Sequence, residues 1–257
     1  MTFDQITLPN GLRIIGEKIG HFRSVSVGLW LGSGSQYETP AEAGLSHFLE
    51  HMVFKGTKKR TARQIAEEMD AVGGQLNAFT AKECTCFYAK VVDEHLPLAM
   101  DVIADLVTAP VFDPVELEKE KGVVIEEINM AEDTPEDLVF ELLMLAHYGD
   151  QPLSRPILGE AKQIQAYRSE DLRAYWSKMY RPQNAVLSIA GNYDWDSVQA
   201  MAAELLGGWP TEGLEQRPYA TTPVQPTVLT REKDIEDRKS TRLNSSHPTT
   251  SRMPSSA

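Results

Sequence analysis

Apolar and polar residues alternate with a period of two in several short stretches of the chain, which is the pattern of half-buried β-strands. In the first stretch the alternation runs on both sides of Asn10-Gly11, a pair that favours the tight turn of a hairpin. The sequence therefore predicts a hairpin over residues 7–15 and further strands over residues 24–31, 75–80, 84–92 and 185–190.

Longer stretches repeat apolar residues every three or four positions, which predicts amphipathic helices. Two of them begin with clear N-terminal signals, Thr61 followed by Gln64 as in a capping box and Asp113-Pro114 as an N-cap with a first-turn proline. Strands mixed with long helices indicate an α+β fold, in which helices cover a mainly antiparallel sheet. The predicted helices span residues 45–55, 61–72, 94–109, 113–132, 135–148, 169–179 and 194–206.

Composition and charge narrow the class of protein. The 257 residues include 37 acidic and 25 basic side chains, a formal net charge of −12, which argues against nucleic acid or an anionic membrane as the main partner. No apolar run approaches the length of a membrane span, and the N-terminal residues lack the pattern of a signal peptide. Two cysteines, Cys84 and Cys86, do not make a disulfide framework. We therefore expect a cytoplasmic protein.

The C-terminal part differs from the rest in composition. Residues 238–257 contain six serines, three threonines and four basic residues but no acidic residue, so they cannot bury enough apolar surface to fold. The abrupt change favours sequence that is not native to the protein, and a natural disordered tail is the alternative. The proline- and threonine-rich residues before it predict a linker over 211–237, which leaves residues 1–210 as the folded domain.

The helix predicted over residues 45–55 carries the most specific chemistry. His47 and His51 are four residues apart and lie on one helical face, with Glu50 beside them. The surrounding residues are apolar nearly all round, so this helix is expected to be buried, where histidines need partners. The spacing H-x-x-E-H is that of the inverted zincins, in which a divalent metal holds both imidazoles. The alternative is a pair of core histidines bonded to backbone carbonyls.

A catalytic zinc ion takes three protein ligands and a water, so a third ligand is needed. In the helix predicted over residues 113–132, Glu120 and Glu127 fall together at the margin of the apolar stripe, while Glu126 points away from it. Carboxylates are uncommon at such a margin unless they are paired. Either could face the histidines, and the alternative is that both reach solvent or pair with lysine or arginine.

These motifs and their surroundings resemble the pitrilysin/insulinase family of zinc peptidases, and its processing-peptidase-like members in particular. The resemblance extends over residues 3–237 and is carried by residues 44–57 (GLSHFLEHMVFKGT), by residues 73–80 (GGQLNAFT) and by a glutamate 76 positions after His51. It implies the LuxS/processing-peptidase-like metallohydrolase fold. It also implies that residues 1–210 are the catalytic domain and that this is the N-terminal half of a two-domain peptidase, whose second, homologous domain or subunit is a partner.

The resemblance assigns roles to five residues of the two helices. It implies that zinc is bound by His47, His51 and Glu127, that Glu50 is the general base, and that Glu120 supports the site as a further catalytic residue. The implied function is that of a zinc metalloendopeptidase acting on unfolded proteins or oligopeptides, with zinc lowering the pKa of a bound water. A fragment without the second domain is expected to hydrolyse peptides poorly.

Substrate contacts also follow from the resemblance. The family's exposed edge strand pairs with an extended peptide backbone, which implies substrate-binding roles for Asn77, Ala78 and Phe79. Phe54 is implied to line a side-chain pocket beside the cleaved bond, and core packing is the alternative. A second interpretation of the whole chain is a non-catalytic peptide-binding subunit of a two-chain peptidase. A zinc lyase that uses a distant cysteine as third ligand does not fit, because no cysteine follows Cys86.

Overall fold

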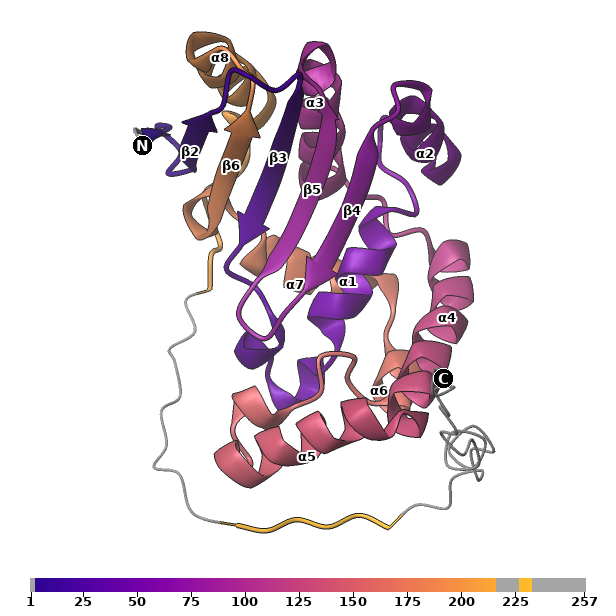
Figure 1. The fold of residues 1–257 in the computed structure, drawn as a ribbon. Helices are drawn as coiled ribbons and strands as arrows, with labels where there is room; N and C mark the ends of the chain where they lie inside the picture. Colours follow the sequence, from indigo (N-terminus) through magenta and orange to yellow (C-terminus); the bar gives the residue numbers. More distant parts are fainter. Residues whose placement is uncertain (1–2, 216–226, 233–257) are drawn as a thin grey trace, which may run out of the picture.

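A single six-stranded sheet organises the part of the chain that this computed structural model describes, residues 3–215 and 227–232 (Figure 1). The strand order is β1-β2-β6-β3-β5-β4, and every neighbouring pair is antiparallel except the parallel pair of β2 and β6. The fold is therefore α+β with a mainly antiparallel sheet, as predicted. The strands are β1 Asp4–Thr7, β2 Arg13–Lys18, β3 Ser24–Leu31, β4 Gln75–Thr80, β5 Thr85–Val92 and β6 Ala185–Gly191.

The helices confirm the predicted segments with shifts of a few residues at their ends. Thr61 caps its helix as predicted, accepting a hydrogen bond from the Gln64 N–H. One short helix, α6, was not predicted. The helices are α1 Leu45–Val53, α2 Ala62–Ala71, α3 Leu96–Thr108, α4 Pro114–Asp133, α5 Pro135–Tyr148, α6 Ala161–Ala166, α7 Ser169–Met179 and α8 Trp195–Leu206.

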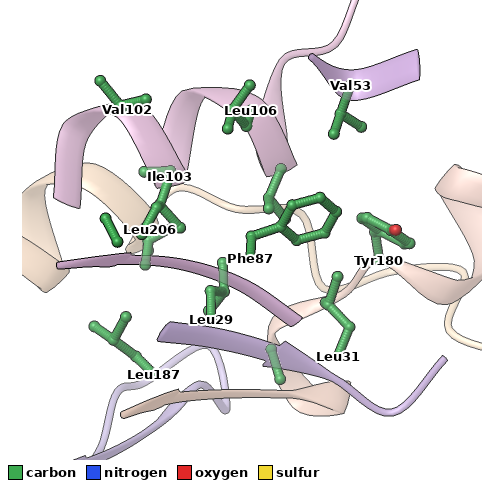
Figure 2. Packing of buried hydrophobic residues seen from close by; sticks show 14 of the residues in the cluster. Leu29, Leu31, Val53, Phe87, Val102, Ile103, Leu106, Tyr180, Leu187 and Leu206 are labelled. Carbon is green, nitrogen blue, oxygen red and sulfur yellow. The ribbon is translucent and has the colours of Figure 1, made fainter. Parts of the chain in front are cut away.

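The core lies between one face of the sheet and the helices packed on it (Figure 2). On β3, alternate side chains face the helices, and Leu29 and Leu31 are fully buried there. Phe87 of β5 meets them from the next strand, and Val102, Ile103 and Leu106 of α3 close over this layer. Burying one such side chain contributes roughly 1.5–3 kcal/mol, so this layer stabilises the sheet against which α1 packs.

The strand β4 forms one edge of the sheet, and no strand of the described residues pairs with its outer side. The helix α1 contacts β4 and β5, and α4 packs against α1. The helix α1, which carries the whole H-x-x-E-H motif, therefore lies next to the open edge strand β4 (Figure 1). The far side of the sheet carries exposed aromatic rings and a hollow of about 430 Å³ bordered by Trp30, Phe79 and Tyr88.

Most of the predicted linker and all of the predicted C-terminal tail fall in residues 216–226 and 233–257, which lie outside the described residues. Residues 211–215 and 227–232 form neither helix nor strand. Within the described ranges, no helix combines the length and apolarity that crossing a bilayer requires.

Candidate metal centre

The helix α1 is held at its N-terminus by glycine and a buried carboxylate. Gly44 is the N-cap residue with φ of 85°, a left-handed conformation that glycine adopts without strain. Glu38 accepts hydrogen bonds from the Gly44 N–H at 2.8 Å and the Ser46 N–H at 2.7 Å, which satisfies amide groups that begin a helix without partners. Burial raises the pKa of Glu38 to about 7, although these N–H groups lower it.

His47 and His51 lie one turn apart on the face of α1 that is turned toward α4, with ring centroids 4.6 Å apart. Their side chains are only 13% and 18% exposed. One carboxylate oxygen of Glu127, on α4, lies 3.6 Å from His47 Nε2 and 3.5 Å from His51 Nε2. The structure thus brings together one donor atom from each of these three residues, all within 4.8 Å of one another.

These distances fit a zinc ion better than direct hydrogen bonds. Both nitrogen–oxygen separations, 3.5 and 3.6 Å, exceed the usual hydrogen-bond length. Two ligands at about 2.0–2.1 Å from a tetrahedral ion lie about 3.3 Å apart, close to what is found here. The donor set of two imidazoles and one carboxylate is also one that catalytic zinc sites use. The residues therefore fit the metal that the sequence predicts.

Glu120 takes a different place from Glu127. Glu120 is buried, with 5% of its surface exposed. One oxygen of its carboxylate accepts a hydrogen bond from His51 Nδ1 at 2.8 Å, and Lys55 Nζ lies 2.6 Å from the other oxygen. Burial alone would raise the pKa of Glu120, but the bonds from His51 and Lys55 lower it. Glu120 therefore fixes the His51 ring with Nε2 facing the other donors, as a supporting residue does in metal sites.

Lys55 was not singled out from the sequence. It follows His51 by four residues and lies in the turn just after α1, whose last residue is Val53. Glu120 and Glu127, seven residues apart on α4, lie opposite these side chains. The pairing of Lys55 with Glu120 joins residues 65 positions apart, so no local spacing in the sequence indicates it.

The two histidines differ in their electrostatic surroundings. Burial, together with the neighbouring His51, lowers the pKa of His47 to about 4, so its ring is neutral at physiological pH. Burial also lowers the pKa of His51, but the bond to Glu120 and the charge of Glu127 outweigh it and raise the value. His47 Nδ1 is buried without a hydrogen-bond partner among the described residues, so no hydrogen bond at that atom orients the ring as Glu120 orients the His51 ring.

Glu50 lies near His47, His51 and Glu127, but it is not one of the three candidate metal ligands. Burial raises its pKa above the ordinary value, although a hydrogen bond from Thr80 lowers it. That bond joins the Thr80 hydroxyl, which donates, to Glu50 Oε2 at 2.5 Å, and it links the edge strand β4 to α1. Thr80 was not predicted as a site residue, although it ends the segment that carries the family resemblance.

A groove of about 640 Å³ runs past this cluster. It is lined by His47 and Glu50 of α1, by residues of β4 that include Ala78 and Thr80, and by residues of α5. An extended peptide backbone has room to lie along the open edge of β4 in such a groove.

The predicted substrate residues do not all face this groove. Ala78 and Phe79 both border the groove, although the Phe79 ring packs against Trp30 on the far side of the sheet, with ring centroids 5.6 Å apart. Asn77 is exposed, and its side chain accepts a hydrogen bond from the Ala78 N–H at 2.8 Å. The structure does not bring Phe54 to the groove: its ring lies 6.2 Å from Phe87 and packs against the core, because it follows the buried end of α1.

A family model described as "Insulinase (Peptidase family M16)" matches residues 13–161, more than half of the chain. The chain belongs to the insulinase family of peptidases. A second model, "Peptidase M16 inactive domain", matches residues 167–252. The described part of that match includes β6, which lies between β2 and β3, so it helps to build the same sheet.

Two curated relatives that are similar to this chain in sequence are named as zinc proteases. The chain is 46% identical over 234 residues to the uncharacterized zinc protease YmxG of Bacillus subtilis, an overlap of 90% of this chain and 56% of YmxG. It is 45% identical over 197 residues to an uncharacterized zinc protease of Streptomyces coelicolor, covering 77% of this chain and 43% of that protein. The chain thus spans about half the length of the curated relatives it matches.

Solved structures share the fold. A protease from Helicobacter pylori superposes with a TM-score of 0.78 at 22% identity, over 88% of this chain and 54% of that one. The periplasmic protease PqqL of Escherichia coli gives a TM-score of 0.79 at 24% identity, over 86% of this chain and 25% of that one. The fold of this insulinase-family chain is therefore that of known proteases of the family.

Proposed function

We propose that this insulinase-family chain is the catalytic part of a zinc metalloendopeptidase that hydrolyses peptide bonds in unfolded proteins or oligopeptides. The observation that carries the proposal is the convergence of donor atoms from His47, His51 and Glu127 within 4.8 Å, beside a carboxylate that is not one of them. A zinc ion held by these residues would polarise the scissile carbonyl and lower the pKa of water at the site.

Glu50 has the properties of a general base in this proposal. It is half-buried where it lines the groove, and burial raises its pKa above the ordinary value, which makes the carboxylate a stronger base. We assign to Glu50 the removal of a proton from the attacking water and its delivery to the leaving amine. Glu120 acts through His51, whose ring it orients, and does not touch the reacting atoms.

The open edge of β4 supports an extended substrate. In an antiparallel pair, alternate residues direct their N–H and C=O groups to the neighbouring strand, so the residues between them offer theirs to the open side. Ala78 and Thr80 are two such residues, and both line the groove beside His47 and Glu50, although the Ala78 N–H donates to the Asn77 side chain and would have to exchange that bond for one to the peptide. A peptide that adds to this edge would pass its backbone over the site, whereas a folded protein could not enter.

We further propose that a second homologous half, as a domain or a subunit, closes over the groove. The helix α5 supports this part, because none of its residues is buried and the side chains of Val139, Phe140 and Leu143 are 57%, 65% and 58% exposed. Exposed apolar side chains gathered on one helix are typical of a surface that another part of a protein covers. The alternative, a peptide-binding subunit without activity, is disfavoured because every residue that the chemistry needs is present.

Hydrolysis of an unstructured fluorogenic peptide tests the proposal. The zinc-loaded chain is assayed alone and with the C-terminal half of YmxG, against Glu50→Gln and against Glu126→Gln, which alters an exposed carboxylate of α4. We expect the second half to increase the rate of cleavage and a chelator to abolish it. Glu50→Gln should lower the rate by at least about 100-fold, and Glu126→Gln should leave it unchanged. Peptide binding without zinc-dependent cleavage in any mixture would favour the binding subunit instead.

A further inference from the structure

Thr80 presents two different groups to the groove. Next along the hairpin, the Ala81 N–H donates to the Cys84 carbonyl at 2.7 Å, so the adjacent pair of Thr80 and Thr85 is one that exchanges no backbone hydrogen bonds. The backbone N–H and C=O of Thr80 are therefore directed to the open edge. Its side chain is directed to α1, where the hydroxyl donates to Glu50 at 2.5 Å.

Among the described residues, Thr80 is the only side chain that donates a hydrogen bond to Glu50. A hydroxyl that donates to a carboxylate forms a charge-assisted bond, which is stronger than a bond between neutral groups. Without it, the Glu50 side chain would keep several rotamers in a groove wide enough for a peptide. The bond therefore selects the position from which Glu50 can act.

Thr80 is itself held in place from the core side. Its Oγ1 lies 3.4 Å from Oγ1 of Thr85, which is fully buried and donates to the Ser33 carbonyl at 2.8 Å. Threonine is β-branched, so few χ1 rotamers are open to it in a strand. The hydroxyl that meets Glu50 is thus presented in one orientation before any substrate binds.

We propose that Thr80 is the positioning residue of Glu50, holding the base with its hydroxyl while its backbone pairs with the substrate. The proposal rests on the proposed function, since it needs Glu50 to be the base. Substrate and base are then aligned by one residue, so a peptide that pairs with β4 as far as Thr80 lies in register with Glu50. Thr80 contacts none of the three zinc donors in this arrangement, so zinc affinity does not depend on its hydroxyl.

The two conservative variants of Thr80 separate this role from ordinary packing. Thr80→Val keeps the shape of the side chain and removes the hydroxyl, whereas Thr80→Ser keeps the hydroxyl and removes a methyl group. A positioning role predicts that valine is the harmful change and that serine regains most of what valine loses. A packing role predicts the reverse order, because only serine leaves a gap.

The first arm of the test measures the bond itself by thermal unfolding of the metal-free chain. Thr80→Val is expected to lower Tm by at least about 3 °C when Glu50 is present and by less than about 1 °C when Glu50 is replaced by leucine. Thr80→Ser should change Tm less than Thr80→Val in the Glu50 background. An equal effect of Thr80→Val in both backgrounds would show that the two side chains are not coupled and would overturn the proposal.

The second arm measures kinetics in the zinc-loaded complex with the second half. We expect Thr80→Val to lower kcat by about 10- to 100-fold with KM, zinc content and the peptide affinity of the metal-free protein unchanged. A loss confined to KM, or an unchanged kcat, would overturn the proposal while the proposed function stood. Absence of hydrolysis in the unaltered complex would contradict both the proposed function and the role of Thr80. This outcome is distinguishable from the others, because it is measured without any variant.

Discussion

Replacement of Glu120 by glutamine tests how the centre is supported. Glu120 uses one oxygen for His51 Nδ1 and the other for Lys55 Nζ, at 2.8 and 2.6 Å. A glutamine amide has one oxygen and one NH₂ group, so it can keep only one of these two partners. Loss of such a supporting partner costs about 10- to 100-fold in metal affinity, which corresponds to about 1.4–2.7 kcal/mol.

The assay is a competitive zinc titration against a chromogenic chelator. Glu116→Gln is the matched control, because Glu116 also lies on α4 and its carboxylate pairs with a lysine at 2.7 Å. Its side chain is more exposed than that of Glu120 and contacts neither histidine. We expect Glu120→Gln to raise the zinc Kd by about 10- to 100-fold and Glu116→Gln to leave it unchanged. A Kd within twofold of the unaltered chain for Glu120→Gln would refute the role assigned to Glu120.

Two further predictions concern the entry to α1. Gly44→Ala should lower the free energy of unfolding, measured in urea, by at least about 2 kcal/mol, because φ is 85° there and an added Cβ would lie 2.7 Å from the Leu158 carbonyl oxygen. Burial raises the pKa of Glu38 from 4.5 to about 7, so the folded chain binds a proton that the unfolded chain releases at lower pH. The free energy of unfolding should therefore fall as pH rises from 4.5 to 7, and Glu38→Gln should flatten this fall; identical pH profiles would contradict the assignment.

Features set by neighbouring residues were open to prediction from the sequence. The alternation in β3 and β5, the capping box at Thr61 and the helical spacing of His47 and His51 depend on contacts within a few residues. The pairing of β6 with β2 and β3 depends on residues more than 150 positions apart, which no local pattern encodes. The helix α6 has six residues, too few for a period to show.

The candidate site divides in the same way. Helical periodicity places Glu120 and Glu127 together at the margin of the apolar stripe of α4. Only the packing of α1 on α4 shows that Glu127 lies near the Nε2 atoms of both histidines and that Glu120 bonds His51 Nδ1. Alternation in β4 separates Phe79 from Ala78, yet it does not tell which of them faces α1. The bond from Thr80 to Glu50 joins a strand to a helix 30 residues away, so no spacing indicates it.

Anomalous diffraction at the zinc edge, from crystals of the zinc-loaded protein, tests whether the three donors hold one zinc ion. We predict one strong peak per chain, about 2.0–2.2 Å from Nε2 of His47, Nε2 of His51 and a carboxylate oxygen of Glu127. A peak held by other residues, or a zinc ion bound to Glu50 or Glu120 in place of Glu127, would contradict it.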